Sequence, residues 1–517
     1  MKRFNTTGNC VSHLNYMVDT SEKINKILLM IEYGDYFVMN RPRQYGKTTT
    51  LSILRKELLT KDDYVPINMS FEVISDQFFE TEKDFCYMIL STISENKVII
   101  DKGYSDLVSS KIHQTTNFSE LSKSITEIIK AINKKVVLMI DEIDKGKIYE
   151  HFIKFLGILR GKFLSARVGD DVTFHSVILA GLNDIKNLKS MIRTDSSAQL
   201  NSPWNIAADF EIDMSFSSNE IETMLIDYAK TTNNSMNTKE ISEYLHYWTS
   251  GYPFLVSKLC RTIDEDIKPS IEWEFYHVDE AVRMLLSSSN TLFEVISKYI
   301  ENNNDFYDLI NKVVFGHEIY EFDTDVPIIH LGNMYGIIKR TDSDKIKIHN
   351  RIFEEKLTQY LIAKNQFKID GYIIEYEPSQ FIKSDGKLDF DLVMYKFQEM
   401  IKENYTQKMF EKYAEIDLRL LFFAFLKQII NGHGFYFKEA QISEEKKLDV
   451  VVVFGKEKFI VELKLWRGDS YHERGLKQLK KYIELESLDK GYMLIMSKNK
   501  EKEFITKSED NIKMFWV

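Results

Sequence analysis

Three charged residues interrupt two apolar runs near the carboxyl end of the chain, in LDVVVVFGKEKFIVELKLW at 448–466. They are Asp449, Glu462 and Lys464. Burying a charge without a partner is costly, so three charges within strand-like runs need a physical reason. Adjacent carboxylates repel each other unless a cation lies between them, and their oxygen atoms suit Mg²⁺ or Mn²⁺. We therefore predict a metal site with a lysine beside it.

A β-hairpin brings the two carboxylates together. The Gly-Lys pair at 455–456 suits a two-residue type II′ turn, which pairs Phe454 with Glu457. Counted back along the strands, this register pairs Asp449 with Glu462, and the alternation of side chains places both on one face. A turn of another length would break this pairing.

The segments around the hairpin supply its context. A strongly apolar run with helical spacing covers 415–430, and a strand is expected over 435–443. After the hairpin, 470–487 is expected to be helical and 490–497 to form the final strand. The predicted order is helix, three strands, helix and strand.

With this order of elements, the last hundred or so residues resemble the PD-(D/E)XK nuclease superfamily. In that superfamily an acid opens the second strand and a (D/E)-x-K element follows on the third. The resemblance implies that Asp449, Glu462 and Lys464 are catalytic, and that both acids bind Mg²⁺ or Mn²⁺. The next helix often carries Gln-x-x-x-Tyr, which Gln478 and Tyr482 match as supporting residues.

One position departs from the superfamily pattern, and another completes it. The proline of the superfamily's name is absent, since Leu448 precedes the first acid. A Glu on the first helix often joins the metal ligands, and Glu415 is the match, with Asp417 as the alternative. An edge hairpin that carries charges for solubility would contain the same residue types without activity.

The helix over 470–487 also carries Arg474, Lys477 and Lys481, about one turn apart. These three side chains either follow the phosphates of a nucleic acid or form a solvated face. The sequence is equally compatible with both alternatives.

A second site is predicted at the other end of the chain, in YFVMNRPRQYGKTTTLSIL at 36–54. An apolar strand, a loop ending in Gly-Lys-Thr (46–48) and a helix follow one another, as a phosphate-binding (Walker A) loop requires. Amides at the helix start would hold phosphate, Lys47 would reach the β- and γ-phosphates, and Thr48 would ligate Mg²⁺.

One position of this loop departs from the usual pattern, because Arg41 stands where a glycine usually begins the loop. We therefore expect the loop to follow a somewhat different path, with positive charge near the nucleotide supplied by Arg41 or Arg43. The complete set of residues expected to bind ATP is Arg43, Gly46, Lys47, Thr48, Thr49 and Asp141.

The run KKVVLMIDEID at 134–144 supplies the partner of that loop. Its apolar residues predict a buried strand that presents Asp141 and Glu142 (Walker B) at the carboxyl edge of a parallel sheet. Asp141 would hold Mg²⁺ through water, and Glu142 would act as general base on the attacking water. The alternative is that these acids only cap the next helix. Asn183, at a strand end, is a candidate γ-phosphate sensor, and Arg193 a candidate arginine finger.

Composition indicates a large globular protein. The chain has 517 residues, too many for one core, while seven prolines and a hydrophobic content of 44% leave little room for disordered linkers. Three scattered cysteines show no metal or redox spacing and suit a reducing cytoplasm. We expect no membrane span and no signal peptide. Because the net charge is −10, contact with nucleic acid must come from local patches.

Two further patterns lie between the two sites. Gly251-x-Pro253 leads into an amphipathic helix and resembles the G-x-P element of STAND and archaeal-type ATPases, which sits in a helical lid. Residues 291–360 then give helices, a segment over 325–340 and a β-turn-β piece ending at 350, an order that resembles a winged helix. Such a module binds DNA or packs against the nucleotide domain, and we favour packing.

Taken together, nearly the whole chain resembles bacterial AAA-ATPase-like proteins of the STAND or archaeal type that carry a C-terminal PD-(D/E)XK nuclease domain. The segments that carry this resemblance are YMVD at 16–19, the RPRQYGKT loop, NSPWNIA at 201–207 and VELKLWRGDSYHERGLKQL.

The expected fold class is multidomain α/β. The expected domains are a parallel-sheet P-loop ATPase at 1–225, a helical lid with the G-x-P element at 226–290, a winged-helix-like module at 291–365, a connecting segment at 366–404 and a small αβββαβ restriction-endonuclease-like domain at 405–517.

The resemblance implies a cytoplasmic hydrolase that binds ATP and Mg²⁺ or Mn²⁺ and cuts DNA under ATP control, in defence against, or processing of, foreign DNA. The nucleic-acid partner is DNA in the first instance, and the sequence is compatible with homo-oligomerisation. One alternative is a STAND-like signalling switch whose C-terminal domain binds nucleic acid without cleaving it. Another is an ATPase scaffold that holds DNA through the winged helix.

Overall fold

The structure is a computed structural model. It describes residues 2–144, 150–181, 204–269, 272–315, 320–366, 377–404, 415–430, 434–438, 441–443, 446–447, 450–454, 457–466, 469–485, 488–497 and 504–517. The chain divides into two compact units. The N-terminal unit comprises Met1–Lys298 and Phe322–Ile352, and the C-terminal unit comprises Tyr299–Glu321 and Phe353–Val517.

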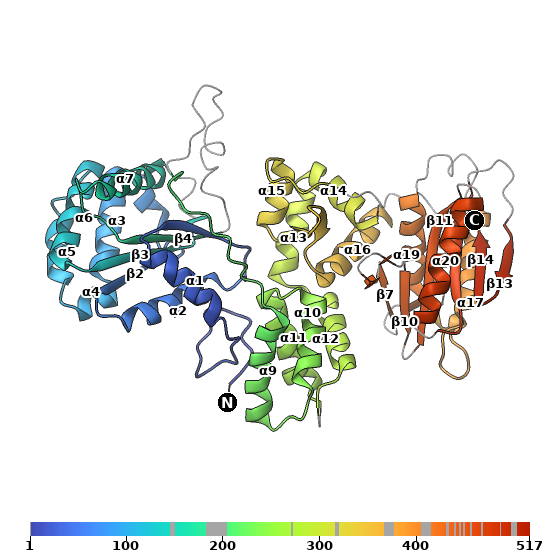
Figure 1. The fold of residues 1–517 in the computed structure, drawn as a ribbon. Helices are drawn as coiled ribbons and strands as arrows, with labels where there is room; N and C mark the ends of the chain where they lie inside the picture. Colours follow the sequence, from blue (N-terminus) through green and yellow to red (C-terminus); the bar gives the residue numbers. More distant parts are fainter. Residues whose placement is uncertain are drawn as a thin grey trace. The chain divides into compact units, whose positions relative to one another are not determined.

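A four-stranded parallel sheet lies at the centre of the N-terminal unit (Figure 1). Its strands are β1 (Tyr36–Asn40), β2 (Tyr64–Ser70), β3 (Lys135–Asp141) and β4 (Ser176–Gly181), in the order β1-β4-β3-β2. The accompanying helices are α1 (Ser21–Glu32), α2 (Lys47–Leu59), α3 (Glu82–Ser94), α4 (Lys97–Asp101), α5 (Ser105–Ile112), α6 (Phe118–Ile132) and α7 (Glu150–Arg167). The prediction of a parallel-sheet α/β fold with a P-loop arrangement is therefore confirmed.

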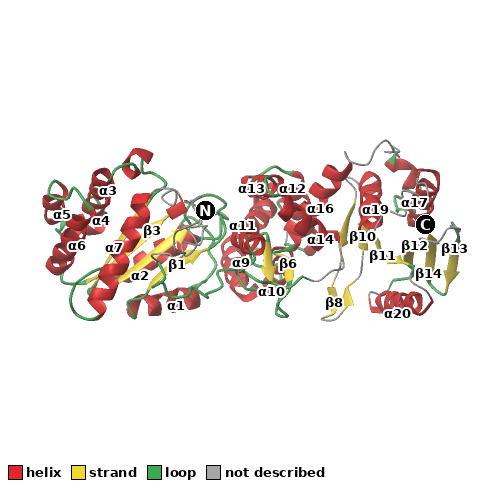
Figure 2. Ribbon diagram, turned by 90° about the horizontal axis from the view of Figure 1, so that it is seen from above, coloured by secondary structure: helices red, strands yellow, loops and turns green. Residues whose placement is uncertain are grey.

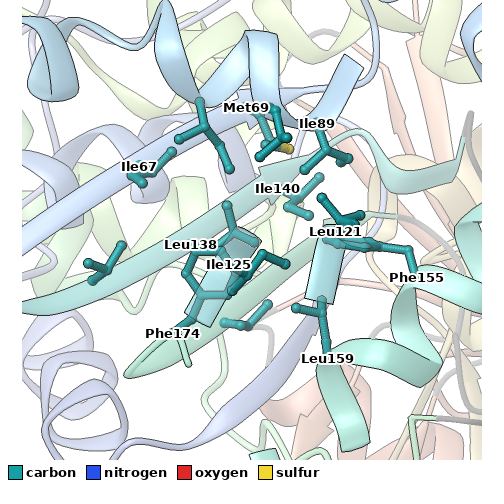
Figure 3. Close-up of a cluster of buried hydrophobic side chains, with 14 of the residues drawn as sticks. Ile67, Met69, Ile89, Leu121, Ile125, Leu138, Ile140, Phe155, Leu159 and Phe174 are labelled. Atoms are coloured by element: carbon teal, nitrogen blue, oxygen red, sulfur yellow. The ribbon is translucent and has the colours of Figure 1, made fainter. Parts of the chain in front are cut away.

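Alternation along the strands divides the buried side chains of this sheet between two faces. Leu138 and Ile140 of β3 join a core with helices α3, α6 and α7, part of which is drawn in Figure 3. Val137 and Met139, the intervening residues, are also fully buried but do not belong to that cluster. Because both faces are covered, the strands read as continuous apolar runs rather than as alternating ones.

Helices and one small hairpin make up the rest of the N-terminal unit. They lie in the segments predicted to be a helical lid and a winged-helix-like module, and these two names are kept for them. The lid consists of α9 (Ser218–Thr232), α10 (Thr238–Thr249), α11 (Pro253–Thr262), the π-helical turn Ile263–Ile267 and α12 (Phe275–Ser287). Helix α13 (Thr291–Glu301) follows and reaches the boundary between the units. The module contains α15 (Pro327–Met334) and an antiparallel hairpin of β5 (Ile338–Arg340) and β6 (Ile346–Ile348).

The C-terminal unit is built on a six-stranded mixed sheet in the order β13-β14-β12-β11-β10-β7. Figure 2 shows α20 on one face of this sheet and α17 and α19 on the other. The helices of the unit are α14 (Asn304–Phe315), α16 (Arg351–Gln366), α17 (Phe390–Asn404), α19 (Glu415–Ile430) and α20 (Asp469–Leu485). The strands are β7 (Gly434–Lys438), β10 (Val450–Phe454), β11 (Glu457–Leu465), β12 (Gly491–Met496), β13 (Thr506–Glu509) and β14 (Ile512–Trp516), with a separate pair of β8 (Gln441–Ser443) and β9 (Lys446–Lys447).

The hairpin of β10 and β11 has the predicted register. Phe454 pairs with Glu457, and the pairing continues to Val450 with Val461. The pair expected next, Asp449 with Glu462, involves a residue outside the described part of the chain. The register of the described pairs is therefore confirmed, and the carboxylate pairing stays a prediction.

Two expectations for this sheet were wrong. The segment at 435–443 is not one strand, because β7 ends at Lys438 and β8 pairs with β9 in a separate small sheet. The strand at 490–497 is not the last one, because β14 pairs in parallel with β12 and β13 adds a further antiparallel strand. The alternation of IKMFW in β14, with Ile512 and Met514 packed in the core beneath α20, explains this extension.

No helix among the described residues is both long enough and apolar enough to cross a bilayer.

Candidate functional site

The loop between β1 and α2 turns sharply at its end. Gly46 precedes the first residue of α2 and has a φ of 79°, in the left-handed region where glycine is favoured. Its carbonyl oxygen accepts from the amide and the hydroxyl of Thr50, at 2.9 and 3.0 Å. The first amides of α2 have no acceptor within the helix, which makes this helix start suitable for an anion.

Lys47 is held inside the loop that precedes it. Its ammonium donates to the carbonyl oxygens of Arg41 and Pro42, at 2.8 and 3.0 Å, and only 8% of the residue is exposed. Burial lowers the pKa of Lys47, while the carboxylates of Glu142 and Asp144 act in the opposite direction. The ammonium is therefore fixed beside the helix start, with carboxylates nearby.

Strand β3 brings its acid to the same place, although β4 separates it from β1 in the sheet. The hydroxyl of Thr48 donates to Oδ2 of Asp141 at 2.7 Å, and Oδ1 of Asp141 accepts from the amide of Glu142 at 2.9 Å. A hydroxyl and a carboxylate at the start of α2 form a set of oxygen ligands that suits Mg²⁺. The predicted proximity of Thr48 and Asp141 is thus observed.

Glu142 follows Asp141 in an uncommon backbone conformation, with a φ of 52°. Non-glycine residues in this region are held there by surrounding structure and are frequent at functional sites. Burial raises the pKa of Glu142; Lys47 lowers it and the neighbouring Asp141 raises it further. A carboxylate with a raised pKa is a better proton acceptor near neutral pH than an exposed one.

Arg41, which replaces the usual glycine, donates hydrogen bonds to backbone carbonyl oxygens. Its guanidinium donates to the carbonyl oxygens of Asn40 at 2.7 Å and Ile212 at 2.5 Å, and lies 5.0 Å from the ring centre of Phe210. Hydrogen bonds of Arg41 thus connect the loop to the segment that contains Ile212. That Arg41 or Arg43 adds positive charge near the nucleotide stays a prediction, and Arg43 is the candidate that these contacts leave.

The G-x-P element contacts this loop directly. The hydroxyl of Tyr252 donates to the carbonyl oxygen of Arg43 at 2.7 Å. Gly251 has a φ of 71°, and a Cβ at this position would lie 1.9 Å from the carbonyl oxygen of Phe216. The glycine therefore permits a close backbone approach that brings the following tyrosine to the P-loop.

The winged-helix-like module also contacts the loop, through residues that the sequence analysis missed. The hydroxyl of Tyr45 lies 3.0 Å from Nε2 of His349 and 2.6 Å from Oγ of Ser215. Burial lowers the pKa of His349 to about 3, so the imidazole is neutral. His349 directly follows β6, and its residue type does not reveal a partner 304 positions away.

Thr49 contacts the N-terminal segment, because its hydroxyl oxygen accepts from the amide of Cys10 at 3.2 Å. Asn183 and Arg193 lie outside the described residues. Of the NSPWNIA segment, Trp204 onward is described, and Trp204 is fully buried.

In the C-terminal unit, Glu462 and Lys464 lie side by side on β11. The ammonium of Lys464 is 2.7 Å from Oε1 of Glu462, whose side chain is 1% exposed. Ile460, two residues earlier on the strand, belongs to the core with α20, so the alternation of side chains places the ion pair on the face covered by α20. A Cβ on Gly475 of α20 would lie 3.4 Å from Cε of Lys464.

The other residues expected at this site are only partly described. Tyr482 of α20 is buried within the same core, and Gln478 is half-buried. Asp449 and the side chains of Glu415, Asp417 and Arg474 lie outside the description, while Lys477 and Lys481 are exposed. Within the described part of the chain, no three His, Cys, Asp or Glu side chains are arranged to hold a metal ion.

A family model described as "Domain of unknown function (DUF8371)" matches residues 390–500. The search of curated proteins gave no match.

Among solved structures, the chain is similar to the Walker-type ATPase Paby2304 of Pyrococcus abyssi, with 14% identity, a TM-score of 0.47 and coverage of 68% of this chain and 99% of that one. It is also similar to the Aeropyrum pernix ORC2 protein (12%, TM-score 0.37, coverage 70% and 98%). A third is the Thermotoga maritima RuvB Holliday junction branch migration motor (15%, TM-score 0.35, coverage 66% and 95%). At these TM-scores, nothing about the chemistry of this chain follows from the similarities.

Proposed function

We propose that the N-terminal unit binds ATP with Mg²⁺ and hydrolyses it. The observation that carries this proposal is the hydrogen bond between Thr48 and Asp141 at the start of α2, beside the buried ammonium of Lys47. A helix start, a lysine and two oxygen ligands are the groups needed to hold the phosphates of a nucleotide and its metal.

Each residue has a distinct role in this proposal. Lys47 would exchange its bonds with loop carbonyls for the β- and γ-phosphates. Thr48, and Asp141 through water, would hold Mg²⁺, which would supply positive charge against the phosphates. Glu142 accepts a proton at its carboxylate from the water that attacks the γ-phosphorus. The bond from that phosphorus to the bridging oxygen then breaks, releasing ADP and phosphate.

The test measures binding of a fluorescent ATP analogue and release of phosphate by the full chain. Lys47→Ala should lose both, because the loop loses its ammonium. Glu142→Gln should keep binding and slow hydrolysis by about 10²–10⁴-fold, the usual effect of losing a positioned base. Lys56→Ala, which removes an exposed lysine from the same helix, is the matched control and should behave as the wild type. Hydrolysis by Glu142→Gln at more than a tenth of the normal rate would exclude this role.

The C-terminal unit has a second candidate function, metal-dependent cleavage of nucleic acid, with DNA as the first substrate to test. The buried pair of Glu462 and Lys464 favours it, because the two charges occupy the strand positions expected of an (D/E)-x-K element. The described hairpin register is compatible with the expected position of Asp449. The proposed roles are metal binding for Asp449, Glu462 and Glu415, and orientation of the attacking water for Lys464. Gln478 and Tyr482 would support the site.

Cleavage is tested on plasmid, linear and single-stranded DNA and on RNA, with Mg²⁺ or Mn²⁺, with and without ATP. Asp449→Asn and Glu462→Gln should both lose cleavage and keep ATP hydrolysis. Lys477→Ala, on the exposed side of α20, is the control for nonspecific loss of charge. ATP hydrolysis without cleavage of any substrate would replace this proposal by the signalling switch. DNA binding with neither activity would replace it by the scaffold.

A further inference from the structure

A cavity of about 1000 Å³ opens beside the P-loop within the N-terminal unit. Its walls come from the start of α1, the loop residues Arg41 and Tyr45, the segment before α9, helix α10 and the β5–β6 hairpin. The lining residues do not include Lys47, Thr48 or Asp141. The cavity is therefore a second space next to the proposed phosphate site, and its size is that of pockets that hold small organic ligands.

Positive charge is concentrated at the end of the cavity formed by the hairpin. Lys339 lies on β5 directly opposite Lys347 of β6, an arrangement in which like charges repel. Burial, and after it the charge of Lys347, lowers the pKa of Lys339 to about 8. Since an ammonium remains largely protonated one unit below its pKa, Lys339 is a cation near neutral pH with water partly removed from it.

Few carboxylates lie near Lys339 at the hairpin end of the cavity. Asp213 acts electrostatically on Arg41, Lys339 and His349, and also on His246 in the cavity wall. Asp342, on the exposed turn of the hairpin, adds to the effect on Lys339. Arg340, which also lines the cavity, pairs with Asp344 at 2.7 Å. Asp213 is then the one lining carboxylate that acts on both Lys339 and Arg41.

The other acids of the wall are Glu220, Asp19 and Glu22, and Glu22 is exposed. Glu220 pairs with Lys23 at 2.6 Å and accepts from the amide of Ser217. Asp19 accepts from the amide and hydroxyl of Ser21. Because Lys339 and Arg41 share the single lining carboxylate Asp213, the hairpin end of the cavity has a local excess of positive charge, which a bound anion would balance.

We propose that this cavity binds a phosphate-bearing small molecule of about nucleotide size, held at its anionic end by Lys339 and Arg41 and separate from ATP at the P-loop. His246 and Tyr45 face the same space and supply neutral hydrogen-bonding groups. Since the walls include the P-loop, the lid and the hairpin, the ligand would contact all three elements together.

The experiment titrates the full chain with inorganic pyrophosphate by isothermal calorimetry at constant ionic strength. It uses the Lys47→Ala background, which removes phosphate binding at the P-loop. Lys339→Met is then added to test the cavity. Lys239→Met, which removes an exposed lysine at the start of α10 outside the cavity, is the matched control. Circular dichroism establishes that each variant is folded.

Saturable binding should persist in Lys47→Ala and in its Lys239→Met double variant. It should weaken about tenfold or more in the Lys339→Met double variant, the effect expected for losing one charge-assisted contact. AMP and ribose 5-phosphate are titrated next, and tighter binding of AMP would assign a nucleobase to the ligand.

Two results would overturn the proposal. Absence of pyrophosphate binding in Lys47→Ala would place all phosphate binding at the P-loop. Equal binding with and without Lys339→Met would remove the cavity as the site. Neither result depends on whether the wild type hydrolyses ATP, so the proposal can fail independently of the ATPase.

Discussion

Acidification should loosen the contact between the winged-helix-like module and the P-loop through His349. This imidazole is buried, bonded to Tyr45, and its pKa is lowered to about 3 from an ordinary value of about 6.5. Because the folded protein binds this proton less tightly than the unfolded chain does, the stabilising effect is complete above pH 6.5 and declines as the pH falls toward 3. At pH 5 the loss is 2.303RT × (6.5 − 5), or about 2 kcal/mol.

Amide hydrogen exchange, read by mass spectrometry on the peptide that covers β5 and β6, measures the free energy of local opening. We expect the wild type to lose about 2 kcal/mol between pH 7.5 and 5 after correction for intrinsic exchange rates. His349→Gln keeps a hydrogen-bonding side chain that does not titrate, so it should lose much less over this range. Other histidines, such as His277, are common to both proteins and cancel in the difference.

A difference between wild type and His349→Gln that stays constant from pH 7.5 to 5 would refute this reasoning. It would mean that the imidazole is protonated in the folded protein without opening the contact. His277→Gln, on lid helix α12, serves as the second control and should leave the wild-type profile of the hairpin unchanged.

Two further predictions concern stability. Gly251→Ala should destabilise the N-terminal unit by about 2–5 kcal/mol, because its φ is left-handed and its Cβ would meet the Phe216 carbonyl. Calorimetry should show a lowered transition, whereas Gly157→Ala, where a Cβ meets nothing within 4 Å, should leave it unchanged or raise it. Lys464→Met should destabilise the C-terminal unit by about 3 kcal/mol, because the buried Glu462 loses its cation. An unchanged melting temperature would contradict the structural importance of the pair.

Local sequence predicted the parts of the two sites that depend on neighbouring residues. The strand, loop and helix around Lys47 are contiguous in the chain, so residue types and spacing indicate them directly. The hairpin register follows from the length of one turn, which is why the pairing of Phe454 with Glu457 was predicted correctly.

Contacts between distant segments could not be predicted in this way. The insertion of β4 between β1 and β3 depends on packing over the whole sheet. The bond from Tyr45 to His349 joins a loop to a hairpin far along the chain, and neither residue type signals the other. Either Arg41 or Arg43 was expected to add charge near the nucleotide, and the motif did not indicate the bond from the Arg41 guanidinium to the carbonyl of Ile212.

The division of the chain into two units has a consequence for dissecting the protein. The backbone passes from one unit to the other after Lys298, after Glu321 and again after Ile352, so a single cut does not separate them. A fragment that ends at residue 365 would retain α14, whose Phe306, Ile310 and Phe315 are buried within the C-terminal unit. Those side chains would become exposed, and the fragment would be prone to aggregate. The two units are therefore best dissected by substitutions within the intact chain.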